Sequence, residues 1–120
     1  MLIGLLHIFL IVPFLIYVGI QRAAMSEFLY NSILLLGIIV FLIHFYKAYT
    51  KWMAGSSKIL INVLHFALIA PLLIAIGYYK KETTQQIYDA ILLIAFSALG
   101  YHSYYVIMEL GTVSGGIKFS

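Results

Sequence analysis

The chain has 120 residues, of which 64% are hydrophobic and only 9% are charged, and its mean hydropathy is +1.07. A water-soluble domain carries roughly 25% charged residues, and a disordered chain needs low hydrophobicity, so both classes are excluded. The lack of cysteine excludes a disulfide framework and an iron–sulfur centre. A net charge of +3 without a basic face excludes nucleic acid as a partner. The composition is that of an integral membrane protein.

Four apolar stretches follow one another along the chain, and each is close to the roughly 20 residues that a membrane-spanning helix needs. Residues 2–20, 28–46 and 59–79 contain no charge, and residues 87–108 contain a single one, Asp89. Backbone polar groups in lipid must be paired within the chain, so all four stretches are predicted to be helical. The predicted fold class is an all-α, multi-pass membrane protein with four transmembrane helices.

An even number of spans places both termini on the same side of the lipid bilayer. Basic residues are slightly more numerous on that side than on the other, with Lys47, Lys51, Lys58 and Lys118 against Arg22, Lys80 and Lys81. Cytoplasmic loops carry the excess of lysine and arginine. The sequence therefore favours cytoplasmic termini by a small margin.

The sequence contains a tandem repeat. Residues 2–49 align without a gap to residues 60–107, and 16 of the 48 pairs are identical. Each copy reads H-x5-P-x5-G and then Y-x13-H-x-Y, which pairs His7 with His65, Pro13 with Pro71, Gly19 with Gly77, Tyr30 with Tyr88, and His44 with His102. We predict two hairpin repeats, residues 1–49 and 60–108, joined by a loop at 50–59 and followed by a flexible tail at 109–120. Both hairpins have the same orientation, which predicts a pseudo-twofold axis along the membrane normal.

The repeat resembles short tandem-hairpin membrane proteins of large DNA viruses. The resemblance rests on LLHIFLIVPFLIYVG and VLHFALIAPLLIAIG, each followed by a second span that ends in HFY or HSY, and it covers about residues 2–107. It implies a viral or host intracellular membrane and a role as a virion component. It assigns no activity to particular residues.

The four histidines are predicted to gather at one membrane face. His7 lies about 8 Å inside the first span and His44 about 3 Å before the end of the second, at 1.5 Å per residue. The duplication places His65 and His102 in the same way. Helical spacing puts them on faces that we expect to point into a four-helix bundle.

Three interpretations of this histidine cluster stay open. The first is anchoring or hydrogen bonding between helices. The second is a cofactor site, where zinc or copper suits an all-nitrogen ligand set, while haem needs a diagonal pair, His7 with His65 or His44 with His102, and more space than the bulky neighbours leave. The third is passage of protons or another cation, since histidine titrates near neutral pH.

Other duplicated positions predict structural features. Pro13 and Pro71 lie in the middle of their spans and are expected to kink them, because each leaves the carbonyl four residues earlier without its partner. Gly19 and Gly77 are expected to end a helix or to allow close helix approach.

A second polar layer is predicted at the opposite membrane face. It holds Asn31 and Asp89, which occupy matching positions, together with Tyr30 and Tyr88. Asp89 is either an interfacial acid that water reaches or half of a polar pair with Asn31. A capping box, Thr83-x-x-Gln86, is expected to begin the fourth helix.

The sequence carries no hydrolase, kinase or dinucleotide-binding motif, so we expect no enzyme. Two functions are compatible with it. One is a protein that binds or passes a proton or transition metal at the histidine cluster. The other is a non-catalytic scaffold, such as a virion inner-membrane component. Its partners would be a second copy or another membrane or capsid protein, held through loops, the tail, or the small residues Ser97, Ala98 and Gly100 of the fourth helix.

Overall fold

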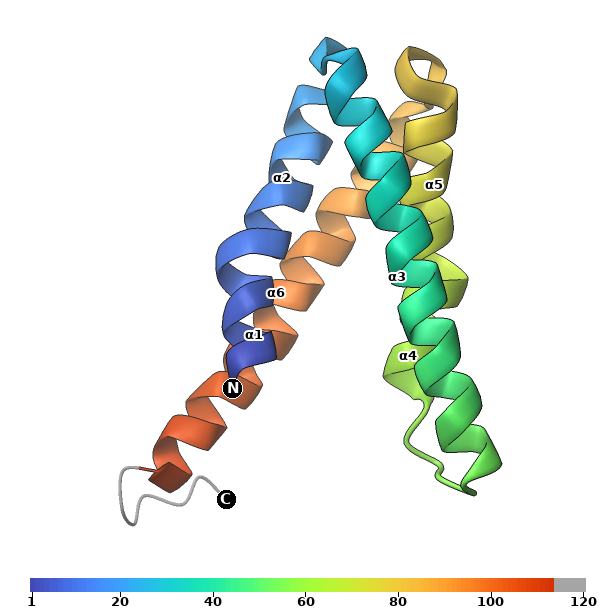
Figure 1. The fold of residues 1–120 in the computed structure, drawn as a ribbon. Helices are drawn as coiled ribbons and strands as arrows, with labels where there is room; N and C mark the ends of the chain where they lie inside the picture. The colour runs from blue at the N-terminus through green and yellow to red at the C-terminus, as the bar shows by residue number, and fades with distance from the viewer. Residues whose placement is uncertain (114–120) are drawn as a thin grey trace. The chain divides into compact units, whose positions relative to one another are not determined.

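The computed structural model describes residues 1–113 and folds them into four long helical segments (Figure 1). The segments contain 23, 27, 23 and 28 residues that are long and apolar enough to cross a membrane. In chain order they are α1 (Leu2–Leu6), η1 (His7–Ile11), α2 (Val12–Gln21) and η2 (Arg22–Ala24); α3 (Glu27–Met53); α4 (Leu60–Leu64), η3 (His65–Ile69), α5 (Ala70–Tyr79) and η4 (Lys80–Glu82); and α6 (Gln85–Val113). The predicted all-α class with four potential spans is confirmed.

Two of the helices extend beyond the bounds expected from the sequence. α3 continues to Met53 and α6 to Val113, so residues 50–53 and 109–113 are helical rather than loop and tail. α3 ends just before a glycine in the left-handed region, since Gly55 has φ +76 directly after the C-cap residue Ala54. The rest of the expected tail, residues 114–120, lies outside the described residues.

The starts of the two long helices differ. Ser26 caps α3, since its side-chain oxygen accepts a hydrogen bond from the Leu29 amide at 3.2 Å. α6 begins at Gln85, one residue later than a cap at Thr83 would require, and the Thr83 hydroxyl is buried with no hydrogen-bond partner among residues 1–113. The predicted Thr83 capping box is therefore wrong, because Thr83 belongs to the end of the preceding turn.

The chain divides into two compact units, and this division crosses the two sequence repeats. Unit 1 consists of residues 1–20 and the chain from residue 88 onward, and unit 2 consists of residues 21–87. In unit 1 the first segment runs antiparallel to α6, and in unit 2 α3 runs antiparallel to α4 and α5 (Figure 1). Each unit therefore joins the first helix of one repeat to the second helix of the other repeat.

Several backbone features recur 58 residues apart. A π-helical turn occupies His7–Ile11 and again His65–Ile69. Positive φ angles of 51° and 54° occur at Arg22 and Lys80, where each first helix gives way to a short 3₁₀ turn. Identical local structure thus follows the duplicated sequence at these positions.

Candidate functional site

Each histidine of the first and third segments begins a π-helical turn. The Val12 amide donates to the carbonyl of His7, and the Ala70 amide donates to the carbonyl of His65, so both bonds reach five residues back. Pro13 or Pro71 follows directly and has no amide hydrogen to continue the regular ladder. The sequence predicted a disturbed helix here, and the structure gives the disturbance its form, a widened turn with a histidine at its start.

Unit 1 contains one stacked histidine pair. The ring centroids of His7 and His102 are 4.2 Å apart and the ring planes differ by 21°. The Nδ1 atom of His7 lies 2.8 Å from the carbonyl oxygen of Ile3, one turn earlier. Because a carbonyl oxygen only accepts, Nδ1 of His7 carries the hydrogen.

Unit 2 contains a second pair with the same geometry. The centroids of His44 and His65 are 4.1 Å apart, again with 21° between the planes. Nδ1 of His65 donates to the carbonyl of Ile61 at 2.6 Å. Nδ1 of His44 lies 3.1 Å from the side-chain oxygen of Asn62, which fixes the second ring as well.

These bonds determine which ring nitrogen is available for chemistry. When Nδ1 donates to an oxygen, the neutral imidazole carries its lone pair on Nε2. His7, His44 and His65 all have this arrangement. Each pair therefore contains at least one oriented Nε2 base, and in unit 2 both rings are oriented.

Asn62 is a site residue that was not predicted from the sequence. Its side chain is only 4% exposed, and it bonds to His44 from within the third segment. The comparison of repeats overlooked it because its counterpart in the first repeat is Gly4. An amide inside an apolar span was the available signal, since polar groups in membrane helices are usually bonded to a neighbouring helix.

A size exchange accompanies this difference. A Cβ atom at Gly4 would lie 2.8 Å from Val106 Cγ2. The position that matches Val106 in unit 2 is the smaller Ala48, which is buried. In unit 1 the small Gly4 thus accompanies the larger Val106. In unit 2 the larger Asn62 accompanies the small Ala48.

The duplicated prolines and glycines have distinct surroundings. Pro13 and Pro71 are exposed on the outside of their helices. Gly19 and Gly77 are buried inside helices, where an added Cβ would lie 2.5 Å from Leu92 and from Leu34, respectively. Both glycines therefore allow close helix approach within their own unit.

The residues expected in the second polar layer separate into buried and exposed sets. Tyr30 and Tyr88 are fully buried, and the Tyr30 hydroxyl donates to the carbonyl of Arg22 at 3.0 Å. Asn31 and Asp89 are exposed on their helices. The Tyr30 bond supports the turn at Arg22, where φ is positive, so this tyrosine has a structural role.

The geometry limits what each pair can bind. A metal ion must lie in the plane of each imidazole about 2.0–2.1 Å from the nitrogen, and two stacked planes about 4 Å apart share no such point. Within residues 1–113, no group of three or more His, Asp or Glu is placed to hold a metal ion. A stack this close also leaves no room for a haem between its two rings.

Comparisons with protein-family models, with curated proteins and with solved structures find no match to this chain.

Proposed function

We propose that this chain is a small integral membrane protein that binds and passes protons at its histidine pairs. The observation that carries the proposal is the stacked imidazole pair, present in each unit with centroids 4.1–4.2 Å apart. A neutral imidazole can accept a proton on Nε2 while Nδ1 keeps its hydrogen bond. Intramembrane ionisable residues commonly mark such proton pathways.

The stacked geometry favours a proton over a transition metal as the bound cation. The two ring planes cannot direct their lone pairs at one zinc or copper ion without changing rotamers. Two imidazolium charges about 4 Å apart repel by about 4 kcal/mol at an effective dielectric constant of 20. Each pair therefore carries at most one excess proton. Because the N–H of each stacked ring points within its own plane, a water molecule has to carry that proton to or from Nε2.

The proposal includes a duplicated architecture. We infer that the two sequence repeats, residues 1–49 and 60–108, are two copies of one hairpin related by a pseudo-twofold axis along the membrane normal. The recurrence of the π-helical turn, the stacked pair and the buried glycine at a spacing of 58 residues supports it. With four spans, both termini lie on one side, and the small lysine excess favours the cytoplasm.

Proton flux into vesicles provides the test. The purified full chain is reconstituted in vesicles that contain a pH-sensitive dye, and a potassium gradient with valinomycin drives the flux. We expect acidification above that of empty vesicles. Replacing both pairs, as in H7Q/H44Q/H65Q/H102Q, should reduce the rate at least tenfold, because glutamine fills similar space but accepts no proton at neutral pH.

Controls separate loss of function from loss of fold. Circular dichroism checks that the glutamine variant keeps its helices. L10M provides a variant at an exposed position of the π-helical turn that leaves all four rings in place. Elemental analysis and an absorption spectrum of the purified protein measure bound metal or haem. Flux equal to that of empty vesicles, or stoichiometric metal lost with the histidines, would overturn the proton proposal.

A membrane scaffold is the second candidate function. It is favoured by Gly100, which is exposed on α6, one turn after exposed Ser97, and a Cβ atom added to it would meet no other atom within 4 Å. Small exposed residues allow another helix to approach closely. Such a protein would serve in a viral or host intracellular membrane, as the resemblance to viral hairpin proteins implies. A scaffold keeps its assembly mass when the histidines are replaced by glutamine.

A further inference from the structure

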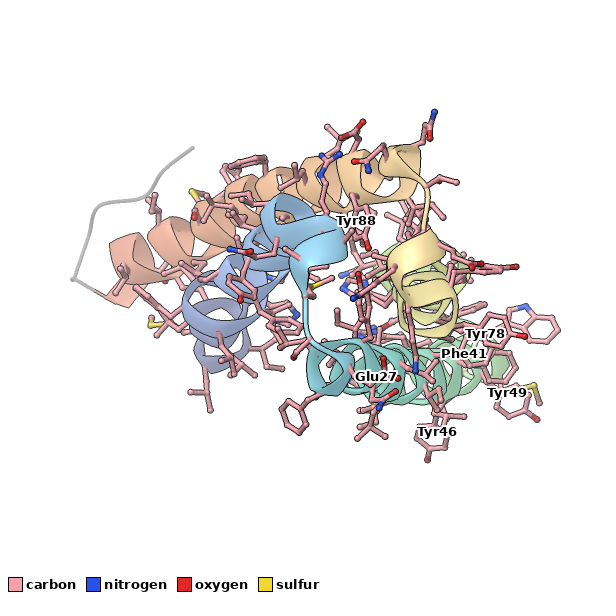
Figure 2. All side chains as sticks on the ribbon, turned by 90° about the horizontal axis from the view of Figure 1, so that it is seen from above. Glu27, Phe41, Tyr46, Tyr49, Tyr78 and Tyr88 are labelled. Atoms are coloured by element: carbon pink, nitrogen blue, oxygen red, sulfur yellow. The ribbon has the colours of Figure 1, made fainter. Side chains whose placement is uncertain are left out.

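An apolar pocket of about 240 Å³ lies within unit 2, near the C-terminal end of α3 and the start of the third segment. Its lining is mainly aromatic and is completed by aliphatic side chains. The aromatic residues are Phe45, Tyr49, Trp52 and Phe66. Phe45 and Phe66 meet edge to face at 5.3 Å, which fixes two of the walls. Figure 2 shows Tyr49 extending outward from α3.

The pocket lies at the boundary between hydrocarbon and headgroups. The uncharged stretch of α3 ends at Tyr46, and Lys47 is the first charge after it. Helix α3 has 27 residues and is about 40 Å long, which exceeds the roughly 30 Å hydrocarbon thickness. Its last two turns, which carry Tyr49 and Trp52, therefore reach the headgroup region.

Three exposed lysines lie in the same part of the chain as the pocket. Lys47, Lys51 and Lys58 are exposed and adjoin the lining residues Ala48, Trp52 and Ile59 in sequence. No Asp or Glu occurs between residues 28 and 81. The surroundings therefore suit an anionic group above an apolar cavity.

The matching region of unit 1 has different chemistry. Ser103, Ile107 and Leu110 stand where unit 2 has Phe45, Tyr49 and Trp52. Glu109 replaces Lys51, and its carboxylate pairs with the N-terminal amine at 2.8 Å. The aromatic lining and Lys51 therefore occur together in one repeat and not in the other, as expected for parts of one site.

We propose that this pocket binds an anionic phospholipid. The upper part of one acyl chain fills the aromatic cavity, and the phosphate lies against the lysines. The volume is below the roughly 300–1,000 Å³ of sites for drug-sized ligands, so it suits a segment of one chain rather than a ring-shaped cofactor. The lysines give the preference for negative headgroups over zwitterionic ones.

The only tryptophan of the chain, Trp52, lines the pocket and reports on its occupant. The full chain is reconstituted in phosphatidylcholine vesicles that contain a small fraction of phosphatidylglycerol. Either one lipid or the other carries bromine on its acyl chains, which quenches indole fluorescence on contact. We expect brominated phosphatidylglycerol to quench Trp52 at least fivefold more per mole than brominated phosphatidylcholine, and to saturate.

Two variants test the two parts of the site. K51Q should lower the preference for phosphatidylglycerol about fivefold, the effect expected for one lysine near an anionic surface. V63F fills the pocket from a half-buried lining position and should abolish saturable quenching while leaving Trp52 in the interface. E109Q, in the matching region of unit 1, is the control and should change neither result.

The outcomes distinguish the alternatives. Equal quenching by both lipids overturns the proposal, because an interfacial tryptophan without a site does not select headgroups. Shielding of Trp52 from both lipids also overturns it, because a second protein copy then covers the pocket. The proton-flux proposal is independent of these results, since its histidines do not line the pocket.

Discussion

The two units hold the same histidine stack in different surroundings. In unit 2 the amide of Asn62 bonds to His44, and small Ala48 lies at the matching position to Val106 of unit 1. In unit 1 the position of Asn62 is taken by Gly4, against which Val106 packs. The ring geometry is nevertheless equal, 4.1 Å against 4.2 Å. The duplicated helix positions therefore determine the geometry of the stack. The neighbouring residues differ, because the small and the large side chain occupy opposite positions in the two units.

The buried glycines make a second comparison between the units. At Gly19 an added Cβ would meet side-chain atoms of Leu92, which can rotate away. At Gly77 it would meet the backbone of Leu34, with the Cα and amide nitrogen at 2.6 Å. Unit 2 therefore has less freedom to adjust than unit 1, and this difference predicts the largest mutational effect.

We expect G77A to destabilise the protein by about 3 kcal/mol and G19A by about 1 kcal/mol, because overpacking costs most where backbone must move. Thermal unfolding in detergent, followed by circular dichroism, measures both. G100A is the matched control, since nothing lies within 4 Å of its added Cβ, and alanine favours a helix over glycine. Equal losses for G19A and G77A would contradict the difference between the units.

The exchanged residues predict a second, smaller effect. G4N should destabilise unit 1 by about 2 kcal/mol, because the new side chain meets Val106. Combining it with V106A recreates the arrangement of unit 2 and should recover about 1 kcal/mol through coupling of neighbours. Unfolding of both single variants and the double variant completes the cycle. Strictly additive losses would show that the two positions are independent.

Removal of the Asn62 amide is expected to lower the free energy of unfolding by about 1 kcal/mol. N62A removes the side-chain oxygen that accepts a hydrogen bond from Nδ1 of His44, so that this bond is lost. Imidazole ¹⁵N resonances should then show a changed tautomer balance at His44, because its Nδ1 has lost the acceptor. Signals of His7 and His102 serve as the internal control, since their unit has no such amide at the matching position. An unchanged His44 spectrum would mean that stacking alone orients the ring.

Much of the fold could be predicted from the sequence, because uncharged runs of about 20 residues have few structural options in a bilayer. The sequence did not predict which helix packs against which. All four helices present leucine- and isoleucine-rich faces, and lipid is as apolar as those faces, so hydrophobicity alone does not select a neighbour. The pairing of His7 with His102 and of His44 with His65 was accordingly not foreseen.

The local disturbances show a similar limit. Pro13 and Pro71 predicted that regular helical hydrogen bonding would be interrupted nearby, because proline has no amide hydrogen. The placement of the wide turn at His7–Ile11 depends on which bond the helix lengthens, and packing decides that. Asn62 was not predicted for a different reason. A comparison of the two repeats identifies shared residues, and Asn62 differs from its counterpart Gly4.

The smallest effect on the folded chain is expected at the small residues of α6, where the repeats also differ. Ser97 and Gly100 are exposed, whereas the matching positions of α3 hold Ile39 and Leu42. S97L and G100L should leave thermal unfolding within about 0.5 kcal/mol, as for other exposed sites. If α6 packs on a second copy or another membrane protein, the added bulk keeps the helices apart and lowers the assembly mass measured by light scattering in detergent. L42I, on the matching face of α3, is the control and should keep that mass. An unchanged mass for both leucine variants would exclude this face of α6 as the contact.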